Sequence, residues 1–308
     1  MSKSTIGPSH EYSAGKRSPK PWVHRIGPRL NFTSILLLFT MVVIAVLLAS
    51  SACTTSPAVQ TYENDFAVGE SPSLVVSSIN GWIHVEAGPG NQVHVEATVR
   101  DFTRMEYTAT ANGDVVTVTA KRKGSVLSGF QGKADIHVTV PAGTPLILET
   151  SNADIAVTGT TGGGVLETSN NEIVLQNVRG DFQGDTSNGA IEINTMEGSG
   201  LFRTSNGHID MTGAKGDFTA STSNGAMLFS GEMIAGGNNR LTTSNGGVTV
   251  ELTGTPSVNV DASTSNGKVT SELEILATVT ETTHLIGKIG AGEADLYIHT
   301  SNGDVTIK

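Results

Sequence analysis

The sequence has 308 residues, of which 36 are Gly and 5% are aromatic, and its formal net charge is −10. So few bulky apolar side chains argue against a large mixed α/β core and favour a narrow β architecture with many turns. The acidic balance argues against nucleic acid as a partner, because phosphate binding requires a basic surface.

Residues 1–53 are expected to form a signal or anchor segment. A basic region precedes an apolar run at residues 35–49, and small residues lead to Cys53, which is the pattern of an export signal. Cys53 stands where a bacterial lipoprotein signal places its lipidated cysteine, so we expect lipidation there. Cleavage by an ordinary signal peptidase and retention of the apolar run remain alternatives, since a spanning helix usually needs about 20 apolar residues. Each alternative places residues 54–308 on the outer face of a bacterial membrane.

The exported part is more acidic than the whole chain. Six of the 19 Lys and Arg, but one of the 29 Asp and Glu, lie before Cys53, which leaves a net charge near −15. Cys53 is the only cysteine of the sequence. The exported part therefore has no internal disulfide and no thiol nucleophile.

Residues 54–70 are interpreted as a spacer, and residues 71–149 as a degenerate β-layer. Four stretches alternate apolar and polar residues and contain Asn-Gly or Gly turns, at 79–88, 91–99, 111–123 and 133–143. They follow no regular repeat. We expect an irregular, partly antiparallel cap, because an open solenoid end exposes a row of unpaired backbone groups.

From residue 150 the sequence repeats the tetrapeptide Thr-Ser-Asn-Gly or a close variant. The repeats are 18, then 21, then 36 residues apart, and they begin at Thr150, Thr168, Thr186, Thr204, Thr222, Thr243, Thr264 and Thr300. After each tetrapeptide, apolar residues alternate with polar ones, and a second short strand precedes the next Thr. An identical corner in the same orientation after every two strands indicates a coil, in which equivalent strands pair in parallel about 4.8 Å apart.

The predicted fold is therefore all-β, a single-stranded parallel β-solenoid of 18-residue rungs at residues 150–308 with an N-terminal β cap. We expect a right-handed coil, from the general handedness of parallel crossovers. Nine rungs would follow one another in chain order to Lys308, with a decayed copy at residues 282–284. The final strand would then leave an edge that is open or closed by a partner.

The repeated Asn-Gly is interpreted as corner chemistry. Asn tolerates the left-handed backbone region and Gly enters it without steric cost. Asn side chains on successive rungs could hydrogen-bond along the axis, as amide ladders do in cross-β stacks, and the preceding Thr could stack in the same way. The predicted ladder comprises Asn152, Asn170, Asn188, Asn206, Asn224, Asn245, Asn266 and Asn302.

The whole pattern resembles the bacterial "putative adhesin" family of exported domains of unknown function. The stretch VPAGTPLILETSNADIAV at residues 140–157, followed by repeated TSNG-x-[IV]-x-[IVLM], carries the resemblance, and INGWIHVE at residues 79–86 fits the opening strands of the same family. The resemblance implies a single-stranded β-helix-like fold on the outer side of a bacterial membrane. Members of this family are often linked to sensing or buffering envelope stress.

Two groups of side chains could carry chemistry. Glu192 and Asp210 would be neighbours on an outward face, where two carboxylates could raise one pKa for acid catalysis or bind Ca²⁺; we favour two solvated surface acids. His84, His94 and His137 could form a three-histidine metal site if their strands were adjacent. Their spacing fits no known metal signature, so we predict no metal, cofactor or catalytic residue.

The function predicted from the sequence is that of a membrane-anchored, non-enzymatic surface scaffold of the bacterial envelope. It would bind a protein or a cell-surface polysaccharide through stacked polar ladders, or through strand addition at an open end. One alternative is a regulatory or stress-sensing lipoprotein that acts through a protein partner. The other is a carbohydrate-active enzyme centred on Glu192 and Asp210.

Overall fold

The computed structural model describes residues 58–124 and 132–308, which form 23 strands and no helix. The chain divides into two compact units, Met1–Thr55 and Ser56–Lys308, and the described residues belong to the second. The predictions for residues 1–53, for Cys53 and for the start of the spacer lie outside the described residues. Within the described ranges, no helix is long and apolar enough to cross a membrane.

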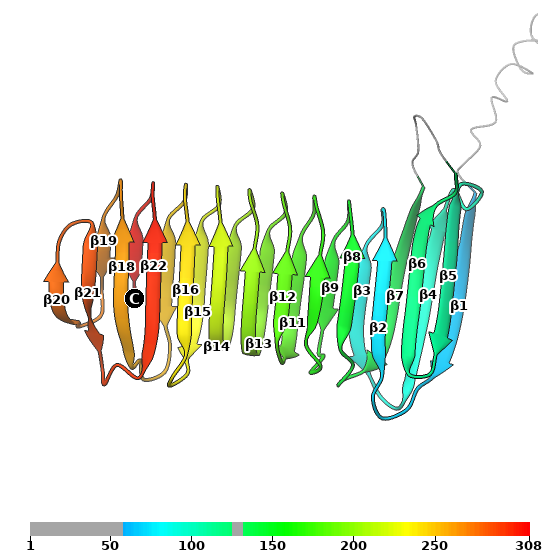
Figure 1. Cartoon of the computed structure of the whole chain (residues 1–308), viewed down its shortest axis with the longest axis horizontal. Helices are drawn as coiled ribbons and strands as arrows, with labels where there is room; N and C mark the ends of the chain where they lie inside the picture. Colours follow the sequence, from blue (N-terminus) through cyan, green and yellow to red (C-terminus); the bar gives the residue numbers. More distant parts are fainter. Residues whose placement is uncertain (1–57, 125–131) are drawn as a thin grey trace, which may run out of the picture. The chain divides into compact units, whose positions relative to one another are not determined.

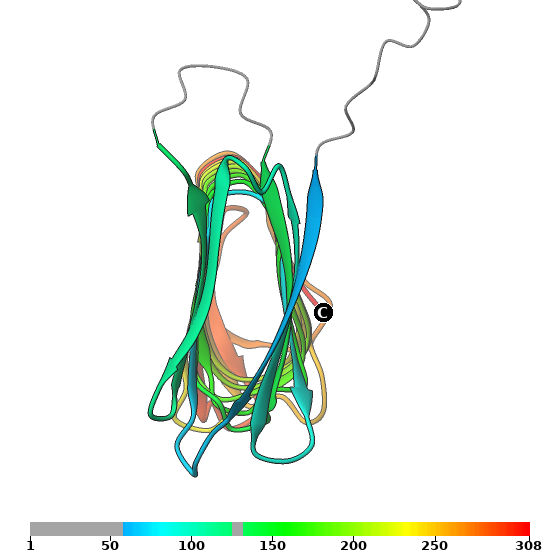
Figure 2. The ribbon, with the colours of Figure 1, turned by 90° about the vertical axis from the view of Figure 1, so that its right-hand side faces the viewer.

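The strands form one continuous sheet that folds into two facing rows (Figure 2). The first row, called row A, runs from β5 to β20 along the stack (Figure 1). In spatial order it contains β5 (Met105–Asn112), β6 (Val115–Arg122), β2 (Ser73–Ser78), β8 (Leu146–Thr150), β10 (Gly164–Glu167), β12 (Phe182–Asp185), the second halves of β13 (Ile191–Arg203) and β14 (Ile209–Thr222), β16 (Asn238–Thr243), β22 (Ala294–Thr300), β18 (Val258–Thr264), β21 (His284–Ile289) and β20 (Leu276–Thr280).

The opposite row, called row B, runs from β1 to β19. In spatial order it contains β1 (Val59–Ala67), β4 (Gln92–Arg100), β7 (Lys133–Pro141), β3 (Ile83–Gly88), β9 (Ile155–Thr158), β11 (Ile173–Arg179), the first halves of β13 and β14, β15 (Met227–Met233), β17 (Val248–Leu252), β23 (Val305–Ile307) and β19 (Val269–Ser271). The chain therefore alternates between the rows as it climbs the stack.

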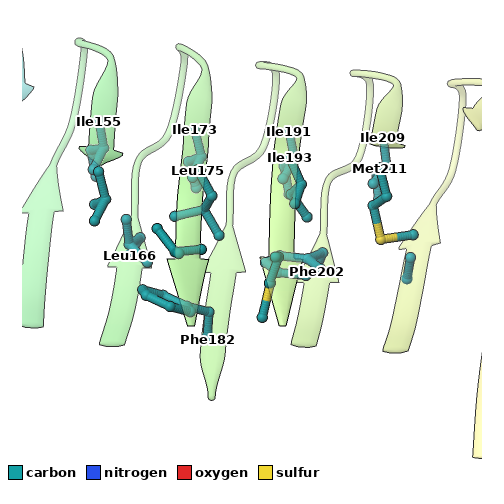
Figure 3. Packing of buried hydrophobic residues seen from close by; sticks show 14 of the residues in the cluster. Ile155, Leu166, Ile173, Leu175, Phe182, Ile191, Ile193, Phe202, Ile209 and Met211 are labelled. Carbon is teal, nitrogen blue, oxygen red and sulfur yellow. The ribbon is translucent and has the colours of Figure 1, made fainter. Parts of the chain in front are cut away.

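Equivalent residues of successive repeats face one another across parallel strand pairs. Ile155 pairs with Ile173, Ile173 with Ile191, and Ile191 with Ile209, so each pairing spans 18 residues of sequence. All four side chains are buried and follow one another along the core (Figure 3). The period-two alternation of the sequence thus becomes columns of apolar side chains between the two rows.

Large and small residues alternate within the columns of row A. Phe182 pairs with Gly200, Gly200 pairs with Phe218, and Gly184 pairs with Phe202. A Cβ added at Gly200 would collide with the Phe202 ring. The three phenylalanine rings therefore fill a narrow core because glycines beside them leave the necessary space.

The last rung of the chain lies inside the stack, not at its end. Strand β22 lies between β16 and β18, and β23 lies between β17 and β19, with parallel pairing on both sides. The prediction of nine rungs in chain order up to Lys308 is therefore wrong for the final rungs. The final strand also does not leave an edge that is open or closed by a partner, because it pairs on both sides within the chain. The corner at residues 300–303 is equivalent to its neighbours, so it fits between two earlier rungs as well as after them.

The first rung is also inserted one position inside the stack. Strand β2 lies between β6 and β8, and β3 lies between β7 and β9. Antiparallel strands finish this end, with β5 beside β6 in row A and with β4 and β1 beyond β7 in row B. At the other end, the antiparallel hairpin of β21 and β20 finishes row A.

Candidate functional site

The corner asparagines form one ladder along the stack. Nδ2 of Asn170 donates to Oδ1 of Asn152 at 2.7 Å, and the other bonds of the ladder measure 2.8 or 2.9 Å. The ladder contains all eight predicted residues together with Asn80, in the order Asn80, Asn152, Asn170, Asn188, Asn206, Asn224, Asn245, Asn302 and Asn266. Asn302 lies between Asn245 and Asn266 in this order because the last rung is inserted between earlier rungs. The Asn-Gly pair at residues 80–81 was the signal that could have identified Asn80.

Each ladder amide also bonds to the backbone of the neighbouring rung. Nδ2 of Asn188 donates to the Ser169 carbonyl at 3.3 Å, and Nδ2 of Asn206 donates to the Ser187 carbonyl at 3.2 Å. An amide group has two donor hydrogens, and these two bonds use both. The ladder therefore holds the corners together, and its amides from Asn152 to Asn266 use both donor hydrogens within it.

The corner threonines follow one another in register, as expected, since Thr222 pairs with Thr243 and Thr243 with Thr300, but their hydroxyls bond to carbonyl groups. The hydroxyl of Thr204 donates to the Gly189 carbonyl at 2.9 Å, and that of Thr222 donates to the Gly207 carbonyl at 2.9 Å. Both threonines are buried, so each hydroxyl satisfies a carbonyl of the rung before it. The threonine suits this position because its hydroxyl can reach a backbone carbonyl of the neighbouring rung.

The corner glycines are required for a reason other than the predicted one. None of the Thr-Ser-Asn-Gly glycines or asparagines has a positive φ. A Cβ added at Gly207 would overlap the Gly189 carbonyl oxygen, and the same collision recurs at the other corner glycines. At these glycines the backbones of successive corners lie in contact, and the absence of a Cβ leaves room for this approach.

Left-handed residues occur instead in a second column, at the bend between row B and row A. Gly159, Asn177, Thr195 and Gly213 have φ values of 73°, 52°, 67° and 65°. They are 18 residues apart in the sequence, so the same bend recurs in four rungs. Thr195 is a β-branched residue, for which this backbone region is strained.

The outer face of row A carries hollows that run across several rungs. One of them, of about 760 Å³, has Ile147, Val165 and Leu201 among its lining residues, beside Asp181 and Asp217. Ile147 is 53% exposed. Sequence reasoning missed this face, because it examined outward residues only in the strand that follows each corner. The outward positions in LILE and GLFRT were the signal that could have found it.

The second hollow of row A lies beside the corners. It has a volume of about 460 Å³ and contains the repeated serines together with acidic residues and one arginine: Glu149, Ser151, Glu167, Ser169, Asp185, Ser187, Arg203 and Ser205. The same types of side chain recur from rung to rung. This face therefore offers hydroxyl and carboxylate groups next to an exposed apolar strip.

The predicted acidic pair lies on the outer face of row B. Glu192 pairs with Asp210, and Nε2 of His208 lies 3.8 Å from a carboxylate oxygen of each. Burial, followed by a hydrogen bond with Glu192, raises the pKa of Glu172 in the neighbouring rung. A hydrogen bond between two carboxyl groups forms only while one of them is protonated, so it favours the protonated form of Glu172.

The three predicted histidines do not gather into one site. His84 pairs with His137, but β7 separates β3 from β4, and His94 lies opposite Thr139. Burial, and then the neighbouring His137, lower the pKa of His84. Within residues 58–124 and 132–308, no group of three His, Cys, Asp or Glu side chains is arranged to hold a metal ion.

His94 connects the first strand to the body of the sheet. Its Nδ1 lies 2.7 Å from an Asp65 carboxylate oxygen on β1, and its Nε2 lies 3.1 Å from a Glu96 carboxylate oxygen on β4. These hydrogen bonds, first to Asp65 and then to Glu96, raise the pKa of His94 above its usual value. Protonated His94 therefore contributes to the attachment of β1.

Comparison with known protein families decides the identity of the fold. The profile of the family described as Toastrack DUF4097 matches residues 73–308. The chain belongs to this family. The matched range begins with β2, the first strand of the inserted rung, and includes every later strand of the solenoid-like stack, while β1 lies before it.

Solved structures with low sequence identity resemble this Toastrack chain. One, titled a putative adhesin from Parabacteroides distasonis, has 14% identity and a TM-score of 0.43, with 81% of this chain and 97% of that chain covered. Another, titled a putative adhesin from Bacteroides fragilis, has 11% identity and a TM-score of 0.39, with 82% and 99% covered. A third, titled a putative lipid binding protein from Parabacteroides distasonis, has 12% identity and a TM-score of 0.32, with 81% and 97% covered. A search of curated proteins finds no match.

The close approach of Toastrack corners predicts a position-specific effect of alanine. Gly207→Ala should lower the free energy of unfolding by about 1–3 kcal/mol or more, because its Cβ has no space against the Gly189 carbonyl. Gly143→Ala is the matched control, since a Cβ at Gly143 meets open space. Urea denaturation measures both. Equal effects of the two substitutions would contradict the close approach of the corners.

The histidine contact predicts that β1 loosens as the pH rises. Because the pKa of His94 is raised in the folded state, its contribution is complete below about pH 6.5 and is lost as the pH rises through the folded pKa. Hydrogen exchange of the β1 amides should therefore speed up across this range by more than the intrinsic pH effect. His94→Gln should abolish the additional change and His84→Gln should retain it. Persistence of the change in His94→Gln would rule out this role.

Proposed function

We propose that this Toastrack protein is a non-enzymatic binding scaffold of the bacterial envelope. It is held on the outer face of the membrane by a lipid at Cys53 or by the apolar segment at residues 35–49. Its stack is a parallel β-helix with 18-residue rungs and a right-handed coil, the hand that parallel crossovers favour. It presents the outer face of row A to a cell-surface polysaccharide.

The hollowed face of row A supports this proposal more than any other feature. Its lining combines the exposed side chain of Ile147 and the half-buried side chain of Leu201 with the carboxylates of Asp181 and Asp217. Sugar rings have apolar faces and hydroxyl edges, so a surface of this kind suits them. Successive rungs lie about 4.8 Å apart, so a linear polymer along the stack meets related side chains at each step.

The internal hydrogen bonding of the corners supports a scaffold role. Each Asn amide is bonded to the next Asn and to a backbone carbonyl, so little of the polar character of the corners is available to a partner. A ladder of this kind resists shear between rungs, which keeps the outer face in a fixed geometry. Preorganised surfaces lose less entropy when they bind an extended ligand.

A pair of lysine substitutions tests the proposal. Ile147→Lys, in the apolar strip of row A, should weaken binding of the full chain to cell-wall polysaccharide about tenfold or more. Val174→Lys, at an outward position of row B, should leave binding unchanged. Co-sedimentation with insoluble cell-wall material from the producing bacterium measures both. Absence of binding by the unaltered protein, or an equal loss in the two variants, would contradict the proposed role of row A.

A further inference from the structure

Strand β20 is a free edge at the end of row A. Within residues 58–124 and 132–308 it pairs with β21 alone, in an antiparallel hairpin with an irregularity between Ala277 and Val279. An edge strand presents a row of unpaired backbone N–H and C=O groups. Because β22 and β23 are inserted inside the stack, this hairpin and not the C-terminal strand is available for strand addition.

The edge is apolar, whereas the edge strands at the opposite end of the stack carry charged residues. Leu276 on β20 is 77% exposed, compared with 53% for Ile147. The five residues of β20, LATVT, include no charged residue and no proline. Charged residues and proline usually protect an edge strand against pairing with another chain. At the opposite end, β1 carries Asp65, which is bonded to His94, and β5 carries Glu106, whose carboxylate lies 3.6 Å from Lys121 Nζ.

A hollow lies beside this edge on the outer face of row A. It has a volume of about 410 Å³, and Leu276, Thr278 and Ile286 line it together with Asp261 and Asp295. The Leu276 side chain is at its β20 side. A strand added to β20 would extend the wall of the hollow, and its outward side chains would lie next to Leu276.

The charges around the edge indicate which kind of chain segment can bind to it. Glu272, Glu274 and Glu281 flank β20 in the sequence and are exposed. Lys288 is the one cation among the residues that line the hollow. A second copy of this chain would bring the same carboxylates and a net charge near −15, so the two copies would repel each other. A segment with Lys or Arg beside an apolar residue would be attracted.

We propose that β20 accepts an extended basic segment of a partner protein as an additional strand. Backbone hydrogen bonds to the free edge hold the segment, an apolar side chain packs on Leu276, and flanking Lys or Arg side chains meet the carboxylates that flank β20 in the sequence and those that line the hollow. This inference rests on the proposed function of a surface-binding scaffold, and it adds a protein-binding site that is separate from the polysaccharide face.

A labelled peptide tests the inference directly. The probe is fluorescein-Lys-Thr-Val-Thr-Val-Lys, titrated with the full chain in mild detergent and followed by fluorescence anisotropy. One control peptide has Pro in place of the first Val, which prevents strand pairing, and another has Glu in place of both Lys. We expect the probe to bind, the Pro peptide to bind about tenfold or more weakly, and the Glu peptide not to bind.

Protein variants locate the site. Leu276→Lys should weaken binding of the probe about tenfold or more, because it adds a positive charge and removes the apolar contact. The double variant Glu272→Gln, Glu274→Gln should bind several-fold more weakly and show a smaller dependence on salt, by roughly the screening expected for two surface charges. Ile147→Lys, on the same face but distant in the stack, is the matched control and should bind the probe normally.

The outcomes separate this inference from the proposed function. No binding of the probe, equal binding of the Pro peptide, or unchanged binding by Leu276→Lys would overturn the inference. Self-association of the unaltered chain that Leu276→Lys abolishes would assign the edge to a second copy and would also overturn it. Binding to cell-wall polysaccharide should be lost in Ile147→Lys and retained in Leu276→Lys, so either proposal can fail while the other stands.

Discussion

Direct contact between the corners of neighbouring rungs is the constraint on which the rest of the structure depends. Eight amide–amide hydrogen bonds link nine asparagines from Asn80 to Asn266. The corner glycines leave no space for a Cβ, and the corner threonines bond to the carbonyls of the rung before them. Each bond contributes only about 0.5–1.5 kcal/mol. Together they set the register, and a slip by one residue would turn every apolar column outward.

This constraint also decides where binding can occur. The polar groups of the corners bond to neighbouring corners, and the apolar columns fill the space between the rows. The outer faces and the strand edges therefore remain for binding. Row A has hollows with exposed apolar side chains beside carboxylates. The hairpin that ends this row has an apolar edge strand within an acidic surface. A scaffold with one polymer-binding face and one strand-binding end is consistent with both features.

The regular part of the stack could be predicted from the sequence because the period of the repeat indicates which residues of successive rungs pair. Period-two alternation placed Ile173, Ile191 and Ile209 in one column, and the repeated Asn placed the ladder. Two aspects could not be predicted. The corner at Asn302 matches its neighbours so well that periodicity cannot decide whether its rung stacks after or between earlier ones. A repeated Gly also has two physical explanations, a left-handed backbone or a close approach, and only the structure distinguishes them.

The insertion of the last rung is tested most directly by disulfide cross-linking of engineered cysteine pairs in a Cys53→Ser background. Thr306 pairs with Thr249 on one side and with Thr270 on the other. Under mild oxidation, Thr306→Cys should form a disulfide with Thr249→Cys and, in a second variant, with Thr270→Cys, because neighbouring strands lie about 4.8 Å apart. The pair Thr249→Cys and Thr270→Cys, which lies two strand spacings apart, should not form a disulfide. Efficient cross-linking of that last pair would mean that the rungs stack in chain order, and it would contradict the account.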